Sequence, residues 1–320
     1  MTERRGWIVA PEDARIRLDQ YLVRLVSSES RSQVQQWIRK GFARVNGSQA
    51  KTGYLIRPGD EITVELPAES QFSLAPEPIP LELLYEDDDI AVIAKPAGLA
   101  CHAGAGVRSG TLVNALLARL GPLRAGEPSR PGIVHRLDKL TSGVMVVAKN
   151  NQAHRCLTQQ FKERTVLKEY LALVYGYPDP PQGAIVSPLG RDLRDRKKIS
   201  VRARRGRSAV THYRVEKKVG PFSLLRIRIE TGRTHQIRVH LASKGHPVVG
   251  DTLYGGRRSR SLADAGLRSA VDSLGRVFLH SCRLEFRHPM SGQRMTFSCP
   301  LPTQLMEFLG AVGTTREGRI

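Results

Sequence analysis

The chain has 320 residues, of which 40% are hydrophobic, so it has room for a large and a small packed domain and is not a disordered chain. Its 50 Lys and Arg residues outweigh 30 Asp and Glu, and the resulting charge of +20 favours a polyanionic partner, nucleic acid before a membrane. Because it has no long apolar run, no secretory signal and no Cys-x-x-Cys pair, we expect a cytoplasmic protein with free thiols.

Two short helices are expected near the N-terminus, after a tail at residues 1–14. Leucines recur at helical spacing from Arg15 onward, which is typical of a helix with one buried face. Ser30 is the expected N-cap of the second helix, and Gly41 is expected to end it.

A small β-hairpin is expected to complete this first module. Asn46–Gly47 and Pro58–Gly59 are turn sequences, and the alternating apolar residues after the second turn predict a strand. Prolines spread over residues 67–80 indicate a stiff linker. We therefore expect a small domain, linker included, at residues 15–75 and a larger domain at residues 76–315.

The larger domain opens with two predicted strands and a helix. Apolar runs at residues 83–85 and 90–94 flank an acidic turn. Thr111 is the expected N-cap of a helix that ends at Gly121. The glycine-rich segment 102–106 lacks the spacing of a P-loop, so no nucleotide site is predicted there.

The stretch at residues 135–143 carries the strongest chemical signal. The apolar run 144–148 follows it and predicts a buried strand, so Asp138 lies in the turn that leads into that strand. Reacting groups are often held on such turns. The flanking Arg136 and Lys139 favour the ionised carboxylate, which can act as a nucleophile. The alternative is that Asp138 only caps the turn.

Tyr170 lies in a second segment of interest, a strand predicted at residues 168–174 after a helix at about 151–162. A strand tyrosine usually packs its ring in the core and bonds its hydroxyl group. Further on, residues 191–207 carry nine Lys and Arg residues. This basic run is interpreted either as a solvated loop or as an arm that binds backbone phosphates.

A third segment, residues 231–240, is rich in histidine. Thr234 is the expected N-cap of a helix that Gly245 stops. His235 and His240 are off one helical face and have no His-Glu-x-x-His pattern around them, so no zinc site is predicted.

The remaining segments predict structure without chemistry. Residues 209–215 and 224–229 alternate as paired strands. Residues 257–277 are polar and basic and are expected to form an exposed insertion. Two closing strands are predicted at residues 278–280 and 284–286, followed by a short terminal helix.

Three strings in the larger domain resemble the motifs of the RluA-type RNA pseudouridine synthases: His135–Arg136–Leu137–Asp138, Lys168–Glu169–Tyr170 and Gln236–Ile237–Arg238. The resemblance implies an α+β fold, with a catalytic domain built on a mixed, mostly antiparallel sheet with flanking helices. It implies that Asp138 is catalytic, that Arg238 pairs with it, and that Tyr170 packs against the target base and can take a proton. Arg136 resembles the family's arginine that fills the space left by the flipped base.

The first module resembles the S4 RNA-binding domain through five strings: Arg17–Leu18–Asp19, Ser30–Arg31–Ser32, Ile38–Arg39–Lys40–Gly41, Val45–Asn46–Gly47 and Pro58–Gly59–Asp60. In that family the second helix and the loop after it face RNA. The resemblance therefore implies RNA-binding roles for Arg31, Arg39, Lys40 and Arg44. The alternative is an ordinary solvated basic face.

The family resemblance also implies a substrate and a reaction. The sequence is most similar to the type that modifies large-subunit (23S) ribosomal RNA, so the expected partner is that RNA or its precursor particle, with no membrane, and the chain is expected to be a monomer. The expected reaction isomerises uridine to pseudouridine and needs no cofactor and no metal. Asp138 could attack C1′, add to C6 of uracil or help remove a sugar proton, and all three courses stay open.

Two functions from other classes remain as alternatives. One is an RNA-binding ribosome-assembly protein whose isomerase site is idle. The other is a glycosidase-type hydrolase, which needs a second carboxylate at about 5–9 Å from the first. Glu169 and Asp251 are the candidates for that second acid.

Overall fold

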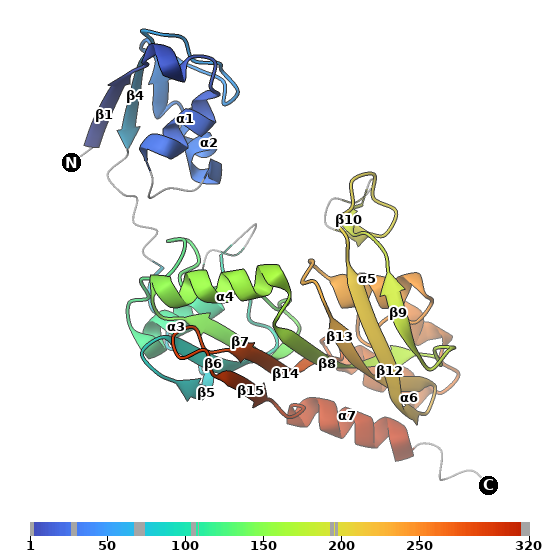
Figure 1. Ribbon diagram of the computed structural model, residues 1–320. Coiled ribbons are helices and arrows are strands. Elements are labelled where there is room, and N and C mark those ends of the chain that lie inside the picture. The colour runs from blue at the N-terminus through green and yellow to red at the C-terminus, as the bar shows by residue number, and fades with distance from the viewer. Residues whose placement is uncertain are drawn as a thin grey trace. The chain divides into compact units, whose positions relative to one another are not determined.

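The computed structural model describes residues 3–26, 31–66, 74–103, 107, 109–192, 195 and 198–314. The chain divides into two compact units, Met1–Ser73 and Leu74–Ile320 (Figure 1). Within the described part, no helix has the length and apolar character that crossing a membrane requires.

The first unit is a four-stranded antiparallel sheet packed on two helices, with strand order β1-β4-β2-β3 (Figure 1). Its elements are β1 Glu3–Ile8, η1 Pro11–Asp13, α1 Leu18–Leu25, α2 Arg31–Lys40, β2 Ala43–Val45, β3 Ser48–Gln49 and β4 Glu61–Leu66. Leu18 and Leu22 of α1 are fully buried, as the leucine spacing predicts. Asn46 and Gly47 both have positive φ, which is the geometry that the expected hairpin turn requires.

The tail expected at residues 1–14 is wrong. Glu3–Ile8 pair with β4 along their whole length, from Glu3 opposite Leu66 to Ile8 opposite Glu61. Val9 is buried and Trp7 packs against the same core. The charged residues at the start of this segment give no indication of these apolar contacts. Ser30, the expected cap of α2, lies outside the described residues.

The second unit is built on a nine-stranded sheet in which β5-β6-β7-β14-β8-β13-β12-β9 are neighbours in that order and β15 pairs with β14. Its strands are β5 Glu82–Glu86, β6 Ile90–Lys95, β7 Ser142–Ala148, β8 Leu167–Tyr175, β9 Gln182–Val186, β12 Val210–Val219, β13 Phe222–Ile229, β14 Leu279–Arg287 and β15 Arg294–Ser298. Its helices are α3 Leu112–Leu120, α4 Asn151–Glu163, α5 Gln236–Ser243, η2 Arg258–Ser261, α6 Ala265–Ser273 and α7 Thr303–Thr314. A separate hairpin, β10 Gly190–Arg191 with β11 Ile199–Ser200, lies in the basic run.

Strand β7 is apolar from Val144 to Ala148 because both of its faces are covered. Val146 and its alternate neighbours pack with Leu157 of α4, whereas Met145 and Val147 pack with Leu116 of α3. Figure 1 shows α4 lying across this part of the sheet. The run that predicts a buried strand therefore marks the centre of a helix–sheet–helix sandwich.

The junction of β7 with β14 is the one parallel pairing among the described strands of this sheet, and it joins Gly143 to Ser281. Gly143 has a φ of +122°, and a Cβ atom there would lie 2.2 Å from the Ser281 carbonyl oxygen. Only glycine allows the two backbones to approach so closely. The strand that follows the Asp138 turn is thereby fixed to the strand next to Tyr170.

Three predictions for the second half of the chain are wrong. The two closing strands form one continuous strand, β14. The segment at residues 257–277 is not simply exposed, because Leu262, Val271 and Leu274 are buried in the main core. Thr234 is not the N-cap of α5; His235 takes that position, with a left-handed φ of 55° and no side-chain cap.

Candidate active site

A cavity of about 390 Å³ opens beside the Asp138 turn in the second unit. Side chains from α4 and β8, the loop before β7 and the segment that enters α5 line it. Asp138, Tyr170, Arg238 and Arg136 all belong to this lining. The structure thus brings together the four large-domain residues that the sequence motifs single out.

Backbone hydrogen bonds and one buried lysine hold the Asp138 turn. The amide of Thr141 donates to the Asp138 carbonyl at 3.0 Å, and the amide of Gly98 donates to the Lys139 carbonyl at 2.8 Å. The Lys95 ammonium group is almost fully buried and donates to the Pro96 and Leu99 carbonyls at 2.7 and 2.8 Å. Burial lowers the pKa of Lys95 to about 8. The loop after β6 therefore holds the Asp138 turn in place through these hydrogen bonds.

Arg238 lies between two carboxylates. Its Nε and Nη2 atoms donate to Asp251 at 2.7 and 2.9 Å, and its Nη1 donates to Asp138 Oδ2 at 3.0 Å. Burial lowers the pKa of Arg238, but the hydrogen bonds and charges of Asp251 and Asp138 outweigh that effect and raise it. The expected pairing of Asp138 with Arg238 is therefore present, and the guanidinium group is permanently charged.

The two carboxylates differ in exposure. The Asp251 side chain is fully buried, while that of Asp138 is 15% exposed. Backbone amides of Leu253 and Tyr254 also donate to Asp251, at 3.1 Å each. No described residue donates a hydrogen bond to Oδ1 of Asp138. Asp138 thus presents one oriented oxygen and one available oxygen to the cavity.

Gln236 closes the loop that delivers Arg238. Its Oε1 accepts from the Thr231 hydroxyl at 2.7 Å and from the Arg233 amide at 3.1 Å. Its Nε2 donates to the Val210 carbonyl at 2.9 Å. Because this one side chain hydrogen-bonds the polar groups of the turn before α5, the helix begins without the Thr234 cap that the sequence predicts.

Tyr254 links the start of α5 to the basic run. Its ring lies 5.1 Å from the Arg238 guanidinium carbon. Its hydroxyl accepts from the Ile199 amide at 3.0 Å and hydrogen-bonds with His235 Nδ1 at 2.7 Å. The other ring nitrogen, His235 Nε2, lies 4.0 Å from Asp138 Oδ2. Burial lowers the pKa of His235, which favours a neutral ring.

Tyr170 is buried in the cavity wall and is 6% exposed. Its neighbour across the β8–β14 pairing is Ser281, whose hydroxyl donates to the Val144 carbonyl at 3.3 Å. Burial raises the pKa of the Tyr170 hydroxyl well above its ordinary value, and the charge of Asp138 acts in the same direction. The phenol is therefore neutral throughout the physiological range.

His135 and Phe161 form another part of the wall. Their rings stack at 4.5 Å. His135 Nε2 accepts from the Val146 amide at 3.1 Å, and burial together with the charge of Lys168 lowers its pKa to about 3. His135 is therefore a neutral structural residue that anchors the turn to β7.

Arg136 is exposed at the cavity, and none of the described residues is its hydrogen-bond partner.

The residues assigned to RNA binding by the S4 resemblance belong to the first unit, not to the unit that holds the cavity. Arg39, Lys40 and Arg44 are exposed there. Arg31 begins α2, and its side chain lies outside the described part.

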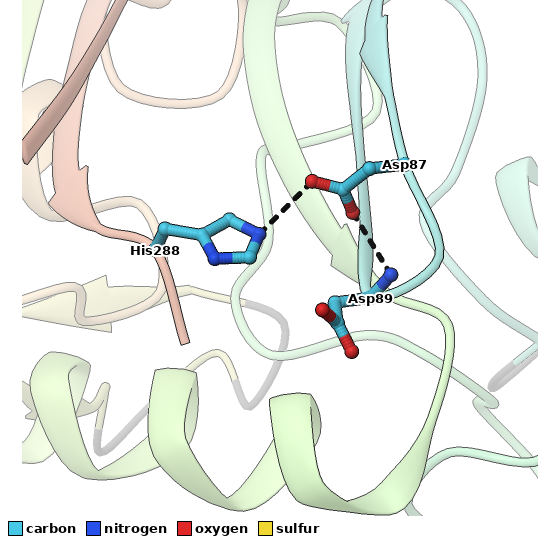
Figure 2. A group of neighbouring side chains, drawn as sticks. All are labelled: Asp87, Asp89 and His288. Atoms are coloured by element: carbon cyan, nitrogen blue, oxygen red, sulfur yellow. Dashed lines mark hydrogen bonds and ion pairs between the residues drawn. The ribbon is translucent and has the colours of Figure 1, made fainter. Parts of the chain in front are cut away.

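Asp87, Asp89 and His288 form the one group among the described residues with the spacing of metal ligands (Figure 2). His288 Nδ1 accepts from the Met290 and Ser291 amides, so its Nε2 carries the proton and donates to Asp87 at 2.9 Å. Asp87 also accepts from the Asp89 amide at 2.8 Å. These bonds join the β5–β6 turn to the turn after β14.

Comparison with known proteins identifies the family of the chain. A family model described as RNA pseudouridylate synthase matches residues 89–243, and an S4 domain model matches residues 16–62. The chain is 41% identical to the RNA pseudouridine synthase YlyB of Bacillus subtilis over 92% of this chain and 93% of that protein. The chain belongs to the RNA pseudouridine synthase family.

Two further relatives extend the comparison. The ribosomal large subunit pseudouridine synthase D of Xanthomonas campestris is 44% identical over 96% of this chain and 92% of its own length. Among solved structures, human RNA pseudouridylate synthase domain containing 1 is similar with a TM-score of 0.55 and 28% identity, over 70% of this chain and 84% of that one. This pseudouridine synthase therefore has the expected α+β fold and the expected S4 module.

Sequence reasoning misses several residues of the synthase site. It suggests Asp251 only as the second acid of a hydrolase, and it assigns no role to Tyr254 or Ser281. Their signals are weak because each is an ordinary polar residue until the fold places it behind Arg238 or Tyr170. Lys168 stands in the second motif, but nothing in the sequence indicates that its ammonium group is buried.

Proposed function

We propose that this synthase isomerises specific uridines of large-subunit (23S) ribosomal RNA to pseudouridine. Its membership of the family supports the reaction, and relatives named ribosomal large subunit pseudouridine synthase D, 41% to 44% identical, support the RNA. The observation that carries the proposal is the Asp138 carboxylate, hydrogen-bonded to Arg238 in a cavity that Tyr170 also lines.

The reaction rearranges one nucleoside without an external reactant. The bond from C1′ to N1 breaks, the uracil rotates, C5 bonds to C1′, and the proton from C5 is lost while N1 gains one. Nothing is oxidised and no group leaves the RNA. The protein must therefore bind the extruded uridine, stabilise charge and move protons.

Asp138 is proposed as the catalytic group. Arg238 orients Oδ2, and Oδ1 has no described donor and is the oxygen available to the substrate. Attack on C1′, addition to C6 and removal of a sugar proton would each use this oxygen. In all three courses Arg238 stabilises the carboxylate before the reaction, and Asp251 holds Arg238 in place.

Tyr170 is proposed to pack its ring against the target base. Its raised pKa supports a neutral phenol, which is a poor base for the proton on C5. Aromatic rings bind bases by stacking, worth about 1–3 kcal/mol per base. We therefore favour the packing role over the proton transfer that the family motif also suggests.

Arg136 is proposed to occupy the space that the extruded uridine leaves. Its exposed, unpaired guanidinium at the cavity supports this role. Residues 15–75 are proposed to anchor the RNA through Arg31, Arg39, Lys40 and Arg44, and residues 76–315 to carry out the chemistry. The exposure of Arg39, Lys40 and Arg44 is what supports the anchoring role.

The hydrolase alternative is less well supported. Asp251 is fully buried and bound to Arg238 through both oxygens. Glu169 pairs with Arg226 at 3.6 Å and does not line the cavity. Asp138 is the one carboxylate in the described lining, so the second acid of a glycosidase is not in place.

The test is tritium release from rRNA labelled at uracil C5, prepared from a strain that lacks this gene. Wild-type protein and Asp138→Ala would be compared, with circular dichroism to establish that both fold. Release by the wild type alone is the expected result, and mapping of the product would give the modified uridine. Release by neither, on rRNA and on precursor particles, would favour an RNA-binding assembly protein with an idle site.

A further inference from the structure

One buried cationic side chain of the cavity has no hydrogen-bond or ion-pair partner among the described residues. Lys168 lies on β8 two residues before Tyr170, so both side chains point to the same face of the strand. Both line the cavity that contains Asp138. Lys168 is only 5% exposed, yet no described residue hydrogen-bonds or ion-pairs with its ammonium group.

The surroundings of Lys168 supply no negative charge. Its nearest described neighbour is the ring of Phe161, whose centroid lies 5.7 Å from Nζ. His135, which stacks on that ring, is neutral. The charged groups that act on Lys168 are Arg164 and Arg228, which are cations themselves. A buried charge without a partner raises the free energy of the folded state, so this ammonium group destabilises the folded protein.

The other charged side chains of the cavity are mostly positive, like Lys168. Six cationic side chains line it, and Asp138 is the single carboxylate among the described lining residues. The cationic set is Arg130, Arg136, Lys162, Lys168, Arg233 and Arg238. Burial lowers the pKa of Lys168 to about 8, so the group still carries its charge at neutral pH. This end of the cavity is suited to an anion that arrives with the ligand.

We propose that Lys168 forms a subsite for a backbone phosphate of the RNA strand that carries the target uridine. This assignment rests on the proposed function in taking RNA as the ligand. Residues two apart on a strand are separated by about 7 Å. When a base packs on Tyr170 beside Asp138, Lys168 lies too far along the strand to contact a uracil oxygen. The group within its reach is the neighbouring backbone phosphate.

The experiment compares Lys168→Met, which removes the charge at similar length, with Lys168→Arg, which keeps it. Lys217→Met, an exposed residue outside the cavity, is the matched control for removal of one positive charge. The probe is rRNA from a strain that lacks the gene. Equilibrium binding and tritium release are both measured across a range of KCl concentrations, together with the melting temperature of each protein.

A phosphate subsite predicts three results for Lys168→Met. The slope of log affinity against log salt becomes shallower by about 0.7–0.9, the effect of one neutralised phosphate. The KM rises by about tenfold with a smaller change in kcat. The melting temperature does not fall, because an unpaired buried charge has been removed. Lys168→Arg and Lys217→Met should retain the wild-type KM.

Other outcomes would overturn the proposal. An unchanged salt slope with a fall in kcat would place the ammonium group on the base. A lower melting temperature in Lys168→Met, with no change in RNA affinity, would make Lys168 a structural residue. A wild-type protein that binds RNA but releases no tritium would overturn the proposed function, and the salt slope would still decide the subsite because binding is measured independently of turnover.

Discussion

Asp251 binds Arg238 through both carboxylate oxygens, at 2.7 Å from Nε and 2.9 Å from Nη2, and leaves Nη1 for Asp138. The inner pair is buried and bidentate, the arrangement that fixes a guanidinium plane most firmly. The outer interaction is a single hydrogen bond to a carboxylate that faces the cavity. The arrangement separates two tasks: Asp251 positions the arginine, and the arginine positions Asp138.

Asp251→Asn should therefore weaken both stability and turnover. Arg238 is 7% exposed, and a buried ion pair that loses one partner typically costs about 3–5 kcal/mol. We expect the free energy of unfolding in urea to fall by about 3 kcal/mol, and kcat to fall by at least about tenfold because Arg238 can turn away from Asp138. Glu216→Gln, which removes a more exposed partner of Arg226, is the control and should cost under about 1 kcal/mol.

Asp138→Asn should show the opposite balance. Arg238 keeps Asp251 as its counter-ion, and the amide oxygen can still accept from Nη1, so stability should change by less than about 1 kcal/mol. Tritium release should be abolished, because the available anionic oxygen is gone. Urea unfolding and the tritium assay check both expectations. A loss of stability equal to that of Asp251→Asn would contradict the separation of tasks.

Tyr170→Phe separates the ring from the hydroxyl group. If the ring packs against the base, the variant should keep kcat within about tenfold of the wild type, and Tyr170→Ala should lose the stacking energy of about 1–3 kcal/mol. Single-turnover tritium release measures both. If Tyr170→Phe is as inactive as Asp138→Asn while its fold is intact, the hydroxyl group carries a proton and the packing role alone is insufficient.

The exposed cations of the S4 module should act on binding and not on chemistry. Arg39→Gln combined with Lys40→Gln should raise KM, reduce the salt slope by about 0.7–0.9 for each phosphate that is no longer neutralised, and leave kcat unchanged. Both side chains are exposed, so the fold should be unaffected. A variant with wild-type KM and salt slope would show that this face is only solvated.

The sequence predicts the site residues that stand within a short motif. It misses the residues that reach the site from elsewhere in the chain. Asp138 and Arg238 are found because each stands in a distinctive string. The role of Asp251 depends on the turn after α5, which returns the chain so that a residue thirteen positions later meets Arg238. Spacing of this kind has no helical or strand period, so the pairing could not be predicted from pattern.

Two errors in the fold have similar causes. The cap rule selects Thr234, but the Gln236 side chain already binds the Thr231 hydroxyl and the Arg233 amide, and no hydroxyl cap is needed. The polar residues in the middle of β14 suggest a break between two strands. The strand continues because Arg283 pairs with Glu285 at 3.0 Å and Ser281 pairs with the backbone of both neighbouring strands.

The unpaired charge of Lys168 should appear in the pH dependence of stability. Burial lowers its pKa from 10.5 to about 8, which corresponds to about 3 kcal/mol of destabilisation at neutral pH. Between pH 8 and 10.5 the unfolded lysine holds a proton that the folded lysine has lost, so this cost disappears as pH rises. Lys168→Met should therefore be more stable than the wild type at pH 7, and the difference should shrink toward zero by about pH 10.5. Urea unfolding of both proteins at several pH values measures it, and because Lys95 and the buried tyrosines titrate alike in both, the difference isolates Lys168. A difference that is absent at pH 7, or that does not depend on pH, would mean that the ammonium group is compensated inside the protein and has no need of an RNA phosphate.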